Sequence, residues 1–350
     1  VHNGPSFDPV TARCGLIKNA TPRAAKMLGA FIGAVPSREA MLLLQQLGIR
    51  TLSRSSADRI AQAYGEHIEE HRDELDSVLI EEFAIPDDAT AVSVSVDRVS
   101  VAMEEPKKKP RRKKKGGPKR PVDVVYRMAY VFCWTLYNRD GDPLYTARGG
   151  RMPQDGTDHE VIERLRWDVK HLIGLRPDLR LVALSDGAPE MIRILKEATE
   201  GLDIDAQLVD VWHVLEYVAE AALAVKKDAK TEVRRAKKDL FEIDDGAKRV
   251  LDRLKRWKTA RKKENKRVPK ALSDAIRYVT NKRDEGLMQY AGARRFGLPV
   301  GSGTVEATAK TLVSIRMKRS GARWKETSGQ HVLTLRSQLL SNRWDEVGAW

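Results

Sequence analysis

The sequence predicts an α/β protein in which a layered region of strands and helices follows an all-helical segment. Two observations lead to this fold class. Apolar residues recur at helical spacing over residues 20–85, whereas residues 91–225 switch repeatedly between strand-like and helical periodicity. Residues 226–295 are charged and helical, which indicates an insertion with a surface of its own.

The N-terminal segment contains three predicted helices with clear start signals. Thr21–Pro22 is typical of an N-cap followed by proline in the first helical turn. Pro36–Ser37 begins a second helix, which Gly48 ends. Ser53 is the expected N-cap of a third helix, which we expect to continue to about residue 82.

The second and third helices, joined by a turn that contains glycine, have the arrangement of a helix-turn-helix. In that motif the second helix enters the major groove and its first residues contact base edges. The residues at this position are Arg54, Ser55, Ser56 and Arg59. The alternative is a small helical bundle that only packs or dimerises.

The α/β region begins at residue 91. Alternating Val and Ser predict a first strand, with Val92, Val94 and Val96 on one face and Ser93, Ser95 and Asp97 on the other. Further strands are expected at 122–137, 144–148, 180–184 and 205–211, with helices at 160–172, 188–199 and 212–225. The chain ends with predicted helices at 304–317 and 328–340.

Positive charge is concentrated in two segments. The chain carries a net charge of +14, and residues 105–120 contribute +9 while residues 226–270 contribute +11. The remaining residues are therefore net acidic, which indicates a polyanion-binding face rather than a uniformly basic surface. The first basic run, which includes Lys113 and Lys114, falls between the first two strands, where it would follow DNA phosphates. The alternative is a solvated loop.

Several classes of protein are excluded by composition. The two cysteines, Cys14 and Cys133, are too few for a disulfide framework or a cysteine-based zinc site. No run of 18 apolar residues is present, so we expect no membrane span, and the N-terminus has no signal-peptide pattern. We therefore expect a cytoplasmic protein.

Three acidic residues stand out by position. Asp97 lies inside an apolar strand, where a carboxylate is costly without a role. Asp186 directly follows a predicted strand, and functional residues gather beyond the carboxyl ends of strands in open α/β sheets. Glu306 begins a helix after a glycine-rich loop. Each acid alone is equally compatible with a turn, a cap or a favourable contact with a helix dipole.

If these three carboxylates converge, they form a site for two Mg²⁺ ions about 3.5–4 Å apart. Mg²⁺ prefers hard oxygen ligands and keeps waters that substrate phosphates can replace. Such a pair of ions supports phosphodiester chemistry. Mn²⁺ is the expected substitute.

The segments 298–306 and 316–324 resemble the C-terminal signature of bacterial insertion-sequence transposases, and most closely the ISKra-type group of DDE transposases. Residues 94–97, 184–188 and 210–216 also resemble signatures of that group, as does the helical part at 37–65. The resemblance covers roughly residues 20–345.

The resemblance implies a ribonuclease H-like mixed-sheet core with a helical insertion, together with an N-terminal all-α helix-turn-helix domain. The first acid of such a core lies on its first strand, the second follows its fourth strand and the third lies on a late helix. Carried onto this chain, the catalytic and metal-binding acids are Asp97, Asp186 and Glu306. The implied domains are 20–85 for DNA binding, 90–215 and 298–345 for the core, and 216–297 for the insertion.

Asp210 and His213 resemble the C/D-x-x-H motif that follows the second acid in Mutator-like and hAT-like relatives. They are candidates for active-site support, either by orienting the scissile phosphate or by supporting the metal site. The alternative is that both residues are structural. The basic residues that follow the third acid are expected to contact DNA; they are Arg316, Lys318, Arg319 and Arg323. Trp324 is expected either to stack on an unpaired base or to pack in the core.

The combined interpretation is a transposase that cleaves DNA at transposon ends and transfers the freed strands by a two-metal mechanism. The expected partners are terminal inverted repeats, target DNA and a second copy of the chain, since two ends must be held together. The alternatives are a ribonuclease H-like nuclease that cuts structured DNA without joining it, and a non-catalytic DNA-binding regulator descended from a transposase. The resemblance also implies a bacterial protein that is held at the nucleoid through DNA.

Overall fold

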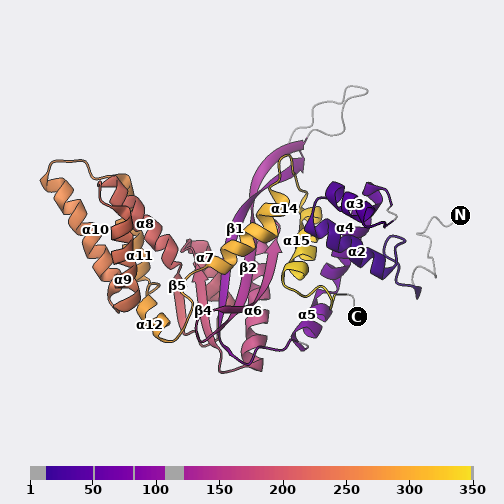
Figure 1. The fold of residues 1–350 in the computed structure, drawn as a ribbon, viewed down its shortest axis with the longest axis horizontal. Helices are drawn as coiled ribbons and strands as arrows, with labels where there is room; N and C mark the ends of the chain where they lie inside the picture. The colour runs from indigo at the N-terminus through magenta and orange to yellow at the C-terminus, as the bar shows by residue number, and fades with distance from the viewer. Residues whose placement is uncertain (1–12, 50–51, 82, 107–121, 348–350) are drawn as a thin grey trace, which may run out of the picture.

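The computed structural model describes residues 13–49, 52–81, 83–106 and 122–347, and Figure 1 shows their arrangement. A central sheet lies between two groups of helices. Insertion helices lie at one end of the molecule, and the N-terminal helices lie at the other, beside the C-terminal helix. The basic run with Lys113 and Lys114 falls outside the described residues.

The N-terminal helices begin where their sequence signals predict. They are α2 (Pro22–Ala34), α3 (Ser37–Gln46), α4 (Arg54–Glu70) and α5 (Arg72–Glu81). The hydroxyl of Thr21 accepts a hydrogen bond from the amide of Ala24, and that of Ser53 accepts one from the amide of Ser56. The predicted third helix is in fact two, because α4 ends at His71 and α5 continues in a separate helix.

Five strands form one mixed sheet in the order β3-β2-β1-β4-β5. The strands are β1 (Ala89–Pro106), β2 (Val122–Asn138), β3 (Pro143–Arg151), β4 (Arg180–Ser185) and β5 (Ala206–Val209). The first three form an antiparallel meander, while β4 pairs in parallel with both β1 and β5. Helices α6 (Thr157–Leu175) and α7 (Pro189–Ala198) provide the crossover connections.

The alternation of side chains along β1 divides the core between the two faces of the sheet. Val92, Val94 and Val96 pack in a cluster with apolar residues of α6 and α7. Val99 and Val101 point to the opposite face, where they pack against the C-terminal part of the chain. Asp97 follows the same alternation and therefore lies on this second face.

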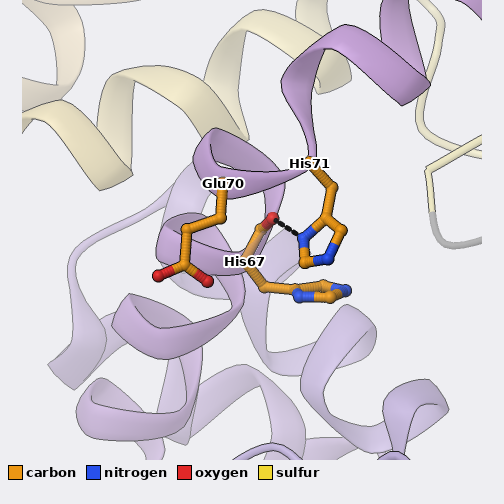
Figure 2. Close-up of side chains that lie close together, drawn as sticks. All are labelled: His67, Glu70 and His71. Carbon is orange, nitrogen blue, oxygen red and sulfur yellow. Dashed lines mark hydrogen bonds between the residues drawn. The ribbon is translucent and has the colours of Figure 1, made fainter.

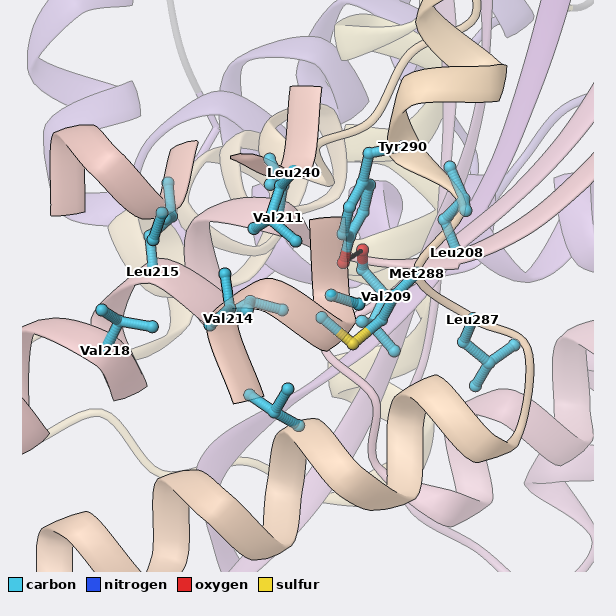
Figure 3. Close-up of a cluster of buried hydrophobic side chains, with 14 of the residues drawn as sticks. Leu208, Val209, Val211, Val214, Leu215, Val218, Leu240, Leu287, Met288 and Tyr290 are labelled. Carbon is cyan, nitrogen blue, oxygen red and sulfur yellow. Dashed lines mark hydrogen bonds between the residues drawn. The ribbon is translucent and has the colours of Figure 1, made fainter. Parts of the chain in front are cut away.

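The insertion consists of helices that share a core with the edge of the sheet. They are α8 (Val211–Ala224), α9 (Ala229–Glu242), α10 (Gly246–Lys263), α11 (Lys270–Asp284) and α12 (Tyr290–Arg295). Figure 3 shows Leu208 and Val209 of β5 among apolar side chains from this helical group, and Tyr290 donates a hydrogen bond to the Val209 carbonyl at 2.9 Å. The helical group is therefore packed directly onto the sheet.

The last part of the chain covers the second face of the sheet. A rod formed by α13 (Gly303–Thr308), a π-helical turn η1 (Ala309–Ser314) and α14 (Ile315–Met317) precedes α15 (Glu326–Leu340). Helix α15 also packs against α4, and there the backbone approach is close. A Cβ at Gly65 would lie 2.8 Å from the Cβ of His331, so only glycine permits this helix contact.

Candidate active site

The register of the sheet brings three aspartates to one level. Ser95 of β1 pairs with Leu184 of β4, so Asp97 and Asp186 lie two positions beyond this pair on neighbouring strands. Ser185 pairs with Val209 of β5, so Asp210 follows at the same level on the third strand. The amide of Asp210 donates to the carbonyl of Ser185 at 2.7 Å, which extends the pairing to this row. The row stands at the carboxyl ends of β4 and β5.

Glu306 joins this row from α13, which lies far away in the sequence. Burial raises the pKa of Glu306, and the carboxylates of Asp210, Glu216 and Asp97 raise it further. Burial likewise raises the pKa of Asp97, and the charge of Asp186 raises it further. The backbone amide of Arg98 donates a hydrogen bond to the Asp97 carboxylate at 2.6 Å, which lowers this pKa. Acidic groups from β1, β4, β5 and α13 therefore act on one another across a short space.

Arg98, the residue after Asp97, forms an ion pair with another acid. The guanidinium of Arg98 forms an ion pair with Glu190 of α7, and the hydroxyl of Tyr130 donates to the same carboxylate. The charge of Arg98 also acts on Asp97 and lowers its pKa, against the rise caused by burial and by Asp186. Carboxylates that raise one another's pKa supply the hard oxygen ligands that Mg²⁺ prefers. Asp97, Asp186 and Glu306 offer oxygen ligands of the kind that Mg²⁺ takes, and their oxygens do not all lie within 4.8 Å of one another in this structure.

Asp210 has a structural role, as the alternative interpretation of the Asp210–His213 pair allowed. Its side chain is almost fully buried, with 1% of the residue exposed. One carboxylate oxygen accepts from the amide of Trp212 at 2.7 Å, and the other accepts from both the amide and the hydroxyl of Ser302. The carboxylate therefore caps α8 and also holds the loop that precedes Glu306.

His213 does not share the contacts of Asp210. Its Nδ1 lies 3.3 Å from a carboxylate oxygen of Glu216, and its ring meets the rings of Tyr217 and Tyr278 edge-on. Asp210 lies in the acidic row, whereas His213 lies on α8 and contacts side chains of the insertion. A catalytic role for Asp210 and His213 stays a prediction.

Tyr278 is a residue of this site that sequence reasoning missed. It lies on α11 of the insertion, and its hydroxyl donates to the backbone carbonyl of Asp186 at 2.9 Å. The following Gly187 has φ +89°, and a Cβ there would lie 2.7 Å from the Tyr278 hydroxyl. The turn that carries Asp186 therefore requires glycine, and the insertion supports this turn directly.

The residues expected to contact DNA divide into buried and exposed groups. Trp324 packs in the core with its indole N–H donating to the Met317 carbonyl at 3.0 Å, so the core-packing alternative accounts for it. Arg316 is also buried, and it donates to the Ile32 carbonyl at the end of α2. The expectation of DNA contact is therefore corrected for both, since neither side chain reaches the surface. Lys318, Arg319 and Arg323 are exposed, and Arg319 pairs with Glu39.

On the N-terminal side, the predicted DNA-contacting face is largely open. Arg54 and Arg59 are exposed at the start of α4. The guanidinium of Arg59 donates to the hydroxyl of Ser56 at 3.3 Å, so this hydroxyl is part of the local capping network with Ser53. The DNA-binding role of this helix stays a prediction.

The exposed indole ring of Trp212 lies beside the acidic row, and sequence reasoning did not single out this residue. Trp212 is 50% exposed, directly after Asp210, and a Cβ at Gly301 would lie 3.0 Å from its indole nitrogen. The ammonium of Lys237 on α9 lies 4.5 Å from the centre of its ring. This cation-π contact carries positive charge from the insertion to the edge of the acidic row.

Similarity to known proteins is found among solved structures. No protein-family model matches the chain, and no curated protein matches it. Among solved structures, the chain is similar to a Drosophila P element transposase strand transfer complex, with 12% identity and a TM-score of 0.29 over 97% of this chain and 84% of that one. No described helix has the length and apolar character needed to cross a membrane. The chain is a mixed α/β protein with a five-stranded mixed sheet.

Proposed function

We propose that this protein is a DNA transposase that cleaves DNA at transposon ends and joins the freed strands to target DNA. The observation that carries the proposal is the row of Asp97, Asp186 and Asp210 across three neighbouring strands, joined by Glu306 from α13. The sheet order β3-β2-β1-β4-β5 is compatible with a ribonuclease H-like core. Acids on the first strand, after the fourth strand and on a late helix match the positions that the sequence resemblance implies.

Asp97, Asp186 and Glu306 are the residues that would hold two Mg²⁺ ions. Bound there, the ions supply activation of the attacking oxygen and stabilisation of the leaving oxygen at the phosphodiester. The protein itself brings the ligands together from separate elements. The sheet register aligns Asp97 with Asp186, and the Asp210–Ser302 contacts hold the loop before Glu306. Tyr278 supports the Asp186 turn from the insertion.

The distribution of positive charge supports a nucleic-acid substrate. Exposed basic residues lie on the segment that follows α14, at the start of α4 and along the insertion helices. On the insertion, Arg253 is bound to Asp239, whereas Lys237 reaches Trp212 beside the acids. Such a surface follows a phosphate backbone by charge, with binding that weakens steeply as salt rises.

The experiment is a reaction on a labelled duplex that carries the DNA flanking the gene, with Mg²⁺ or Mn²⁺ compared with EDTA. A transposase cuts at the element end only with metal and joins the new 3′ end to a second DNA. Cleavage without joining would favour a nuclease instead. Tight binding that is equal in EDTA, with no cleavage under any condition, would contradict the proposal and leave a DNA-binding regulator.

Replacing Asp97 by Asn is expected to stabilise the metal-free protein while it abolishes cleavage. Asp97 has a raised pKa in the folded state, so its charge opposes folding progressively as pH rises through that pKa, and Asn removes this cost. We expect a gain of about 1 kcal/mol in EDTA at pH 7.5. Below the ordinary Asp pKa of 3.8 both side chains are neutral and the gain vanishes. Urea unfolding of both proteins at pH 7.5 and below pH 3.8 measures the difference in the free energy of unfolding. An equal or lower stability of Asp97→Asn at pH 7.5 would show that burial and the neighbouring acid do not penalise the Asp97 charge.

Replacing Asp210 by Asn is expected to slow cleavage by about 10- to 100-fold, because the amide presents a donor to the Ser302 N–H and the loop before Glu306 shifts. DNA affinity in EDTA is expected to stay unchanged, since the defect is one of positioning. Asp228→Asn is the matched control, because Asp228 caps α9 in the same way but lies outside the site. Steady-state cleavage and DNA-binding titrations measure both variants. A cleavage rate of Asp210→Asn equal to that of wild type would show that Asp210 does not position the loop before Glu306.

A further inference from the structure

The C-terminal turn of α4 carries a second group of metal-ligating side chains, remote from the acidic row. His67, Glu70 and His71 offer ligand atoms that all lie within 4.8 Å of one another, and they are the single such group of three found in the described part of the chain. Figure 2 shows the two imidazole rings lying one above the other, with Glu70 beside them on the same turn of helix. We propose that these three residues bind one transition-metal ion of the Zn²⁺ type.

Helical spacing produces this arrangement. Residues three and four positions apart lie on one face of a helix, so His67 faces both Glu70 and His71. The ring centres of the two histidines are 4.2 Å apart. Two imidazoles and one carboxylate form a three-residue ligand set that Zn²⁺ uses in open sites, where water fills the fourth position.

The hydrogen bonding of His71 prepares it as a ligand. Its Nδ1 lies 2.9 Å from the carbonyl oxygen of His67. Because a carbonyl only accepts, Nδ1 carries the proton, and the lone pair of the neutral ring is on Nε2. Ligating histidines typically donate their other ring nitrogen to a carbonyl or carboxylate in this way, which fixes the tautomer and the ring orientation.

The nitrogen-rich ligand set differs in chemistry from the acidic row. Imidazole suits Zn²⁺, Ni²⁺ and Cu²⁺, whereas Mg²⁺ takes oxygen ligands, so the two sites select different ions.

The three residues lie at the end of α4, next to the start of α5. His71 is the C-cap of α4 and directly precedes α5. Its neighbour Glu69 is held by Arg72 of α5 and by Arg151 of β3, so the junction between α4 and α5 is already tied to the sheet. An ion bound by His67, Glu70 and His71 would link residues of this one turn and stiffen the end of α4 where α5 begins.

The test is a titration of the full chain, stripped of metal with EDTA and dialysed, using Zn²⁺ in calorimetry and Co²⁺ in visible absorption. We expect one Zn²⁺ per chain at this site, a tetrahedral Co²⁺ spectrum, and a melting temperature that rises with Zn²⁺ concentration. His67→Ala and His71→Ala are each expected to weaken the binding by more than about 10-fold. Glu70→Gln is expected to weaken it less, because two imidazoles remain.

His171→Ala is the matched control. Its Nδ1 lies 2.8 Å from the Trp167 carbonyl and its ring lies against Trp167, so it shares the local geometry of His71 but has no second histidine one turn before it. Asp186→Asn is a second control, because it alters the acidic row and leaves this site intact. Equal Zn²⁺ affinity of His71→Ala and wild type, or loss of binding in Asp186→Asn alone, would overturn the proposal. Melting in EDTA verifies that each variant folds.

Discussion

Asp186→Asn is expected to abolish DNA cleavage and strand transfer while the protein still folds and binds DNA. The substitution keeps the shape of the side chain and removes the charge at the centre of the row, between Asp97 on β1 and Asp210 on β5. A bound metal ion lowers the activation free energy of phosphodiester cleavage by several kcal/mol. Loss of a ligand to that ion is therefore expected to lower the rate by about 10³-fold or more. Time courses on the labelled end duplex measure the loss.

The matched control for this variant is Asp178→Asn. Asp178 lies before β4, at the opposite end of the strand that Asp186 follows, and it forms an exposed ion pair with Arg176. Exposed pairs contribute little, so this variant is expected to cleave like wild type. Cleavage by Asp186→Asn within a few-fold of wild type would show that the acidic row does not perform the chemistry.

Arg336→Met is expected to have the largest effect on stability. Arg336 of α15 is buried, and burial with the nearby Arg316 lowers its pKa to about 10. Its guanidinium donates to the carbonyls of Leu312 and Thr311 in η1 and to those of Gly33 and Ala34 at the end of α2. Because Met leaves these carbonyls without a donor, we expect a loss of about 3 kcal/mol or more. Urea unfolding measures it.

The control for this prediction is Arg319→Met, which makes the same exchange at an exposed site where the side chain pairs with Glu39. We expect a change of no more than about 1 kcal/mol there. An equally small change for Arg336→Met would mean that water reaches the carbonyls of α2 and η1. Apolar residues such as Leu335 and Val347 would then contribute more than Arg336 to holding the N-terminal helices against the core.

Local sequence signals predicted much of the framework. The alternation around Asp97 gave the correct strand and face, and the caps at Thr21 and Ser53 marked true helix starts. These features depend on a few neighbouring residues, which is why a single sequence reveals them. The predicted order of strands and helices from residue 91 to residue 225 is likewise present, with the boundaries extended at β1 and β3.

Contacts between distant segments escaped prediction. Asp210 and Ser302 are separated by 92 positions, as are Asp186 and Tyr278, and no local pattern links either pair. The same limit explains Arg316. On sequence alone it is one basic residue in a basic run, and only the docking of α2 onto the C-terminal rod turns it into a buried donor to the Ile32 carbonyl. Burial of this kind is decided by tertiary packing.

The most direct test of the acidic row is anomalous diffraction from crystals of the protein grown with Mn²⁺. The account predicts Mn²⁺ peaks within coordination distance of the Asp97, Asp186 and Glu306 carboxylates, and their loss in crystals of Asp186→Asn. Mn²⁺ bound elsewhere on the protein, with these carboxylates engaged only by protein groups, would contradict the assignment of this site as the catalytic centre.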